Sequence, residues 1–307
     1  MSGIILHHYP LSPYSEKIRL LFGLKGVEWR SVEVPVMTPR PLLTPTIGGF
    51  RRIPILQIGA DFYCDTLLIS DVIEKMRPLP GLFPQDQLAL IKPVCWWIEK
   101  SSYMNALCLA VGGMAGHVPD ALVEERTAFF GFNLDPNRLL TQRRLYLQRL
   151  DAHLSWLEEI LSDGRKFIFG NHPTAADLAA YHLIWFVRQN GGPEIAALLP
   201  ALAASAWYDR VAAFGYGSAS PMTAEAAIEI AREAIPEDIN HWSGDAANIG
   251  LRMGDRVRVT ADDYGKDPVV GRLLAWTADK VVIRHTEPSV GDVNLHFPRA
   301  GFDVQAA

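Results

Sequence analysis

The sequence predicts an α/β domain, then an all-helical domain, then a small C-terminal β-barrel. Up to residue 84, segments with strand and helix patterns follow one another as strand, helix, strand, strand, strand and helix. The next region carries apolar side chains at helical spacing, and the last one consists of short strand-like segments separated by turn residues. The predicted boundaries are 1–84, 87–214, a linker with one helix over 215–249, and 250–307.

The first domain contains the pattern of a parallel strand–helix–strand unit followed by a hairpin. Its predicted strands are residues 4–8, 28–34, 53–58 and 61–64, and its predicted helices are 13–24 and 65–75. A Pro- and Gly-rich stretch separates the second strand from the third. This order is typical of an α/β layer architecture.

The second domain shows its clearest helix where leucines step by three and four residues. These are Leu147, Leu150, Leu154, Leu157 and Leu161. A further helix is expected to begin at Thr174, because Thr174 and Asp177 have the spacing of a capping box. We assign both residues to folding.

The third region begins with strict alternation over 256–259, and turn residues such as Gly, Asp and Ser separate its further short segments. Strands are predicted over 256–259, 269–276, 280–285, 293–297 and 302–304, and the linker before them carries a helix over 223–234. Such short strands, closely spaced, favour a small barrel.

Composition excludes several classes of function. The net charge of −5 argues against a nucleic-acid-binding protein. Cys64, Cys95 and Cys108 match no metal or disulfide spacing, so each is interpreted as a small buried residue in a reducing compartment. No signal-peptide pattern opens the chain and no long apolar run follows. We expect a cytoplasmic protein that binds no metal, nucleic acid or membrane.

The tetrapeptide Ser12-Pro13-Tyr14-Ser15 joins the first predicted strand to the first helix. Ser12 can cap that helix, with Pro13 as its first residue. The unpaired N–H groups and the dipole at a helix start favour an anion, including a thiolate. Two interpretations are open from these residues alone: Ser12 is only a cap, or it also faces a bound sulfur.

The wider pattern resembles the glutathione transferase family, in particular its serine-type members. Four pieces occur in the family's order: Ser12-Pro-Tyr-Ser-Glu-Lys-Ile-Arg19, Ile53-Pro54, Asp65-Thr66 and Pro173-Thr-Ala-Ala-Asp177. The resemblance covers about residues 1–215. It implies a thioredoxin-like first domain, a helical second domain of the transferase type, and glutathione as co-substrate. It implies nothing for the C-terminal module.

The resemblance gives Ser12 a catalytic role, as the donor of a hydrogen bond to the sulfur of glutathione. A free thiol has a pKa near 8.5, and lowering that pKa by about two units requires roughly 2.7 kcal/mol. A hydroxyl donor and a helix N-terminus can each contribute on the order of 1–3 kcal/mol. Both sulfurs of the redox motif Cys-x-x-Cys are replaced by oxygen in Ser12 and Ser15, which excludes dithiol exchange there. Tyr14 is expected to flank the sulfur, or else to pack at the domain seam.

The resemblance also implies where the rest of the tripeptide binds. A cis peptide before Pro54 would turn the Ile53 N–H and C=O outward to pair with the cysteinyl backbone; the alternative is that Pro54 only begins an edge strand. Asp65 would face the γ-glutamyl ammonium, and Thr66 would bind its carboxylate. The family usually carries Glu or Gln followed by Ser at this pair, so Asp-Thr is a departure with a shorter acid; the alternative is that Asp65 is an ordinary helix cap.

A cation is also required for the glycyl carboxylate of glutathione. Arg40 stands at about the distance before Ile53 at which relatives carry Lys, and Arg51 and Arg52 are closer in sequence. We prefer Arg40, with a solvated surface charge as the alternative.

Two functions from different classes fit these residues. The first is a glutathione transferase in which Ser12 activates the thiol for attack on a small hydrophobic electrophile, by conjugation, isomerisation, ether cleavage or dehalogenation. The second is a non-catalytic protein that binds glutathione or another small ligand, or that serves in assembly. The resemblance further implies a homodimer.

Overall fold

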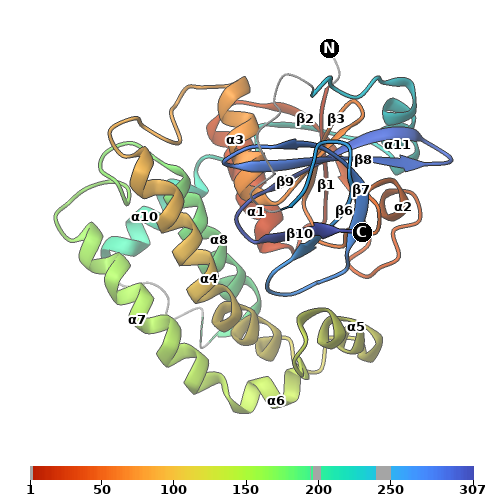
Figure 1. The fold of residues 1–307 in the computed structure, drawn as a ribbon. Coiled ribbons are helices and arrows are strands. Elements are labelled where there is room, and N and C mark those ends of the chain that lie inside the picture. The colour runs from red at the N-terminus through yellow and green to blue at the C-terminus, as the bar shows by residue number, and fades with distance from the viewer. Residues whose placement is uncertain (1–2, 194, 196–201, 240–249) are drawn as a thin grey trace. The chain divides into compact units, whose positions relative to one another are not determined.

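The computed structural model describes residues 3–193, 195, 202–239 and 250–307, which form two compact units. The first unit joins Met1–Ser15, Glu28–Val72 and Ser218–Ala307, and the second joins Glu16–Val27 and Ile73–Gly217 (Figure 1). The C-terminal module therefore belongs to the same unit as the N-terminal strands. No helix among these residues combines the length and apolar character that a membrane span requires. The last part of the predicted linker, 240–249, lies outside the described residues.

The N-terminal strands form the predicted thioredoxin-like arrangement. Strand β1 (Ile4–His8) pairs in parallel with β2 (Glu28–Glu33) and antiparallel with β3 (Ile55–Ile58), which pairs in turn with β4 (Asp61–Cys64). Helix α1 (Pro13–Leu24) follows β1, and α3 (Thr66–Met76) follows β4. Strand β3 begins two residues later than predicted, after Pro54, which has no N–H to donate to a ladder. The short helix α2 (Leu43–Thr46) was not predicted, because it lies in the Pro- and Gly-rich stretch.

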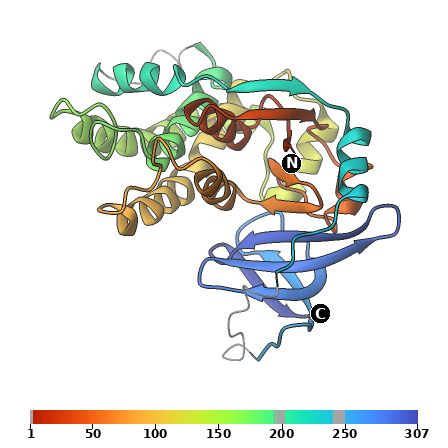
Figure 2. The same ribbon diagram turned by 90° about the horizontal axis from the view of Figure 1, so that it is seen from above.

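All five predicted strands of the C-terminal module are present. Each of these strands, β6 (Arg256–Ala261), β7 (Val269–Trp276), β8 (Lys280–Glu287), β9 (Gly291–Pro298) and β10 (Phe302–Ala306), is antiparallel to its neighbours within the module. Figure 2 shows these blue strands curving around one another. Strand β9 also pairs in parallel with β4, so the module continues the N-terminal sheet in the order β10-β6-β7-β8-β9-β4-β3-β1-β2-β5. The predicted small barrel is thus a curved sheet module, and no ladder of the described residues pairs β10 with β9.

The linker contributes to the same unit. Strand β5 (Ser218–Pro221), which was not predicted, pairs in parallel with β2, and α11 (Ala224–Glu233) is the predicted linker helix. A single hydrophobic cluster contains side chains from both ends of the chain, among them Phe50, Phe297 and Phe302. The centroids of these three rings lie 5.4–6.2 Å apart. Burying such aromatic side chains stabilises the unit by about 1.5–3 kcal/mol each.

Hydrogen bonds at two buried positions join the N-terminal strands to the segment after residue 217. At the first, Asp61 accepts from Asn294 Nδ2 at 2.8 Å, from His296 Nε2 at 2.8 Å and from the Glu237 N–H at 2.9 Å. Burial raises the pKa of Asp61, but the hydrogen bonds from His296, the Glu237 N–H and Asn294 outweigh it and leave that pKa below its usual value.

At the second position, a glutamine links β1 to α11. Gln57 Oε1 lies 2.7 Å from His7 Nε2, and Gln57 Nε2 donates to the Ala227 carbonyl at 2.7 Å. Both side chains are fully buried. We call the bonds of Asp61 and Gln57 together the buried joins.

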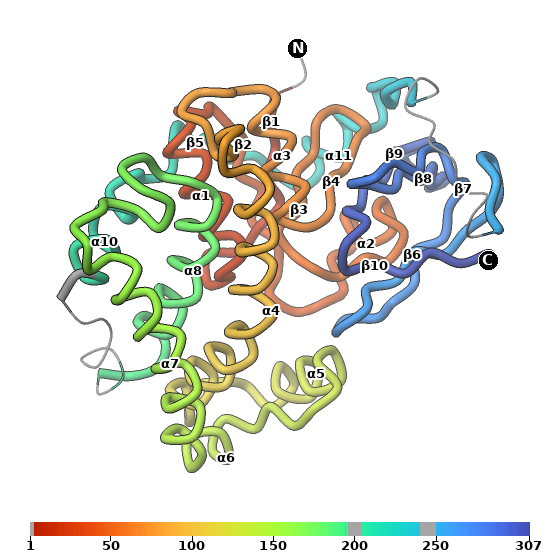
Figure 3. The backbone as a smooth tube through the Cα atoms, turned by 60° about the vertical axis from the view of Figure 1, so that its left-hand side comes forward, coloured from red at the N-terminus to blue at the C-terminus, as the bar shows by residue number. Residues whose placement is uncertain are grey.

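The second unit is helical, as predicted. Its helices include α4 (Leu88–Gly113), α5 (Asp120–Phe130), α6 (Pro136–Thr141), α7 (Arg143–Leu161), α8 (Ala175–Asn190) and α10 (Leu202–Ala212). Figure 3 shows α4 beside α7 and α8. The predicted capping box of Thr174 and Asp177 is confirmed, and Asp177 also accepts from the Ile168 N–H at 2.9 Å and from Trp207 Nε1 at 2.8 Å. Cys64, Cys95 and Cys108 are buried, as interpreted from the sequence.

Candidate functional site

Ser12 lies between β1 and α1 and caps the helix as predicted. Its Oγ accepts from the Ser15 N–H at 3.1 Å, and its own N–H donates to the Tyr9 carbonyl at 3.2 Å. Pro13 is the first helical residue, where a missing N–H is tolerated. Because the cap uses the oxygen as an acceptor, the hydroxyl proton of Ser12 can still be donated to another group.

Ser15, which lies one helical turn after Ser12, has a hydroxyl in different surroundings. Its side chain is fully buried, and its Oγ has no hydrogen-bond partner among the described residues. The two hydroxyls of the tetrapeptide therefore differ: Ser12 is at the end of the helix and Ser15 is inside it.

The Ile53–Pro54 peptide is cis, as predicted. The described part of the chain supplies no hydrogen-bond partner for the N–H or C=O of Ile53. One backbone donor and one backbone acceptor are thus available at this position to an extended ligand.

Asp65 begins helix α3 in a conformation that few side chains adopt. Its φ is +78°, its Oδ1 accepts from the Leu67 N–H at 2.9 Å, and its carbonyl accepts from Ile69 at 3.0 Å. Aspartate is among the residues that are enriched at positive φ. An aspartate therefore suits the backbone conformation at this position. Thr66, the next residue, is buried.

Arg40, the preferred cation for the glycyl carboxylate, is buried and makes backbone contacts. Its guanidinium donates to the carbonyls of Pro35 at 3.0 Å, Arg51 at 2.8 Å and Val36 at 3.2 Å. Only 3% of the residue is exposed. These contacts count against a ligand-binding role for Arg40. That role stays a prediction.

The two other candidate cations contact the loop between β6 and β7, residues 262–268, which we call the β6–β7 loop. Arg52 forms an ion pair with Asp263 and donates to the Tyr264 carbonyl, and its guanidinium lies 4.2 Å from the centre of the Tyr264 ring. Arg51 forms an ion pair with Asp267 at 3.3 Å. The charge of Asp65 also acts on Arg52, so the start of α3 is near these contacts.

Tyr264 connects this loop to the start of α1. Its side chain is hydrogen-bonded to that of Tyr14. Burial raises the pKa of the Tyr264 phenol well above its usual value; Arg52 and the Tyr14 hydrogen bond lower it, and the carboxylates of Asp263 and Asp65 raise it. Tyr264 is therefore a neutral phenol at physiological pH.

The structure thus brings Tyr14, Asp65 and Arg52 together through Tyr264, for which the sequence predicted a turn position and left barrel core and a contact face as alternatives. The Asp263-Tyr264-Gly265 turn signal gave its local conformation. Its neighbours depend on the pairing of β4 with β9, which no local pattern indicates.

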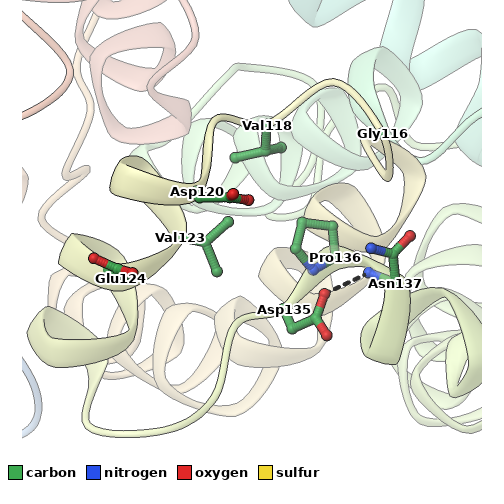
Figure 4. A pocket seen from close by; sticks show the side chains of 8 residues that line it. All are labelled: Gly116, Val118, Asp120, Val123, Glu124, Asp135, Pro136 and Asn137. Atoms are coloured by element: carbon green, nitrogen blue, oxygen red, sulfur yellow. Dashed lines mark hydrogen bonds between the residues drawn. The ribbon is translucent and has the colours of Figure 1, made fainter.

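Elsewhere, the second unit contains a hollow of about 480 Å³ (Figure 4). It is lined by Gly116, Val118, Asp120, Val123, Glu124, Asp135, Pro136 and Asn137. Asp135 caps α6 by accepting from the Asn137 N–H at 2.9 Å. The hollow contains none of the predicted site residues, and the described residues include no group of three or more His, Cys, Asp or Glu placed to hold a metal.

Comparison with known proteins covers both units. A model of the N-terminal domain of glutathione S-transferases matches residues 6–81, and a model of the C-terminal domain matches residues 123–210. A GST-like protein from Pseudomonas syringae has a solved structure that is 34% identical, with a TM-score of 0.83 over 100% of both chains. That similarity includes the C-terminal module.

Two curated relatives match shorter segments. A maleylacetoacetate isomerase of Mus musculus is 28% identical over 86 residues, which are 27% of this chain and 40% of the relative. A probable glutathione S-transferase of Solanum tuberosum is 25% identical over 75 residues, which are 24% of this chain and 35% of the relative. The chain thus spans less than half the length of these curated relatives.

Proposed function

Because the chain belongs to the glutathione S-transferase family, we propose that it is an enzyme in which Ser12 activates the thiol of glutathione for attack on a small hydrophobic electrophile. The observation that carries the proposal is the geometry of Ser12. Its oxygen caps α1 through the Ser15 N–H, and its hydroxyl proton is left for a ligand at the helix end.

The chemistry follows from the charge that Ser12 faces. The thiol proton leaves to solvent, and the resulting thiolate receives the Ser12 hydrogen bond and the positive end of the α1 dipole. Ser12 acts as a donor and not as a base, because a hydroxyl is a far weaker acid than a thiol. The thiolate then forms a sulfur–carbon bond with the electrophile. The carbon's leaving group departs, or its π electrons move to a neighbouring atom.

The remaining predicted residues hold the tripeptide. The Ile53 N–H and C=O pair with the cysteinyl backbone, Asp65 faces the γ-glutamyl ammonium, and Thr66 binds the γ-glutamyl carboxylate. The positive φ of Asp65 supports this assignment, since strained backbone clusters at ligand sites. Tyr14 flanks the sulfur. The expected homodimer and cytoplasmic location stay predictions.

A second function, non-catalytic binding of a small ligand other than glutathione or a role in assembly, is favoured by a specific observation. Arg40, Arg51 and Arg52 all contact acceptors of this chain, which weakens the case for tight binding of a doubly carboxylated ligand.

Two serine variants test the proposal. In Ser12→Ala we expect glutathione-dependent turnover to fall about 10- to 100-fold, the effect of losing one hydrogen bond to a charged acceptor, while retention on immobilised glutathione persists. Ser15→Ala, which removes a buried hydroxyl of the same helix, is the matched control and should keep both. The assay uses electrophiles for conjugation, isomerisation, ether cleavage and dehalogenation.

Each outcome has a defined meaning. Retention of the unmutated protein with no turnover on any electrophile would favour a protein that binds glutathione without turnover. Equal turnover of the Ser12 variant and the unmutated protein would overturn the catalytic role of Ser12.

A further inference from the structure

We infer that the β6–β7 loop competes with a ligand carboxylate for Arg51 and Arg52, so that the site prefers tripeptide thiols whose glycyl carboxylate is neutralised. This inference rests on the proposed function of the same site. It assigns the C-terminal module a part in ligand selection.

The position of the two arginines identifies the ligand group involved. They directly precede Ile53, whose backbone is proposed to pair with the cysteinyl residue. The γ-glutamyl carboxylate is assigned to Thr66, so the carboxylate that is left for Arg51 and Arg52 is the glycyl one. Arg40 is committed to three backbone carbonyls.

The loop already supplies carboxylates to both arginines. Asp263 pairs with Arg52, and Asp267 pairs with Arg51 at 3.3 Å. A glycyl carboxylate that approached would meet two like charges and would have to displace them. A glycyl end without charge would meet no such repulsion.

The pairs are also of a kind that a ligand can disturb. The Asp267 side chain is 43% exposed and that of Asp263 is 28% exposed, so water partly screens both ion pairs. In addition, the buried Nε–H of Arg52 has no hydrogen-bond partner among the described residues. The guanidinium thus retains a donor that the loop does not satisfy.

Calorimetric binding of two ligands to the full chain tests the inference. The ligands are glutathione and its glycinamide form, which lacks the glycyl charge. The protein is compared with the double variant Asp263→Asn and Asp267→Asn, in which each side chain keeps its size and one oxygen acceptor. The control is Asp292→Asn in the same module, because Asp292 pairs with Arg284 at 3.3 Å and is 47% exposed.

The unmutated protein should bind the glycinamide at least as tightly as glutathione. In the double variant, glutathione should bind about tenfold more tightly than before, as expected for a charge-assisted contact, and glycinamide binding should change less than about threefold. The control should change neither affinity.

Two results would overturn the inference and are distinguishable. If both ligands bind and the double variant leaves their affinity ratio unchanged, the loop does not compete and the proposed function stands. If neither ligand binds any of the proteins, the proposed function fails with it. Thermal unfolding of each variant verifies that it is folded.

Discussion

The C-terminal module meets the N-terminal strands through two sets of aspartates in very different surroundings. At the buried joins, Asp61 is 5% exposed and accepts from three donors that are fixed by strands and backbone. At the β6–β7 loop, Asp263 and Asp267 face arginines in partly exposed pairs. Where water is excluded, the Asp61 carboxylate therefore helps to hold the module on the N-terminal strands. Where water enters, the carboxylates of Asp263 and Asp267 can release their arginines to a ligand carboxylate.

The largest effect expected from this difference is on stability. Replacing Asp61 with Ala leaves the His296 and Asn294 donors and the Glu237 N–H without their acceptor. At about 1–3 kcal/mol for each unsatisfied buried donor, the free energy of unfolding should fall by about 3–5 kcal/mol. Asp267→Ala, at the exposed set, should lower it by less than about 1 kcal/mol. Urea unfolding of both variants measures the two values, and similar losses would contradict the distinction between the two sets.

A smaller loss of unfolding free energy than that caused by replacing Asp61 is expected when acid weakens the buried joins. Burial lowers the pKa of His7 from 6.5 to about 4, against the opposing hydrogen bond of Gln57. Between these values the unfolded chain binds more protons than the folded one, so the free energy of unfolding falls as pH decreases. The contribution of His7 is about 3 kcal/mol over that range. His296 acts in the same direction, since burial lowers its pKa despite Asp61.

The histidine variant His7→Gln keeps a donor for Gln57 and removes the titrating group. Its unfolding free energy, measured from pH 7 to pH 4, should depend less steeply on pH than that of the unmutated protein. His172→Gln, at an exposed position, is the control and should keep the original slope. A slope equal in all three proteins would show that His7 is not the acid-sensitive group.

The same contrast explains how much could be predicted from the sequence. Local signals gave the four strands and two longer helices of the first domain, the capping box of Thr174 and Asp177, the cap at Ser12 and all five strands of the module, but not the short helix α2. Helical spacing, alternation and turn residues are properties of neighbouring residues, so one sequence suffices for them.

Contacts between distant segments could not be predicted in this way. Strand β4 pairs with β9 through backbone groups that every strand has, so no local pattern marks β9 as the partner of β4. In the folded unit, Tyr264 lies beside Tyr14 and Arg52. Arg40 was preferred by its distance along the chain, whereas its burial follows from how residues 35–51 fold around it. The sequence shows which residues carry a charge, but it does not show which group each charge contacts.

The most direct test of the account is the pKa of the glutathione thiol on the protein. Ultraviolet absorbance of the thiolate, followed against pH with the full chain in excess, should give a pKa about two units below the free value of about 8.5. This lowering should be reduced in Ser12→Ala and kept in Ser15→Ala. A bound thiol that titrates at the free value, or with the same lowering in both serine variants, would contradict the proposal that Ser12 at the start of α1 stabilises the thiolate.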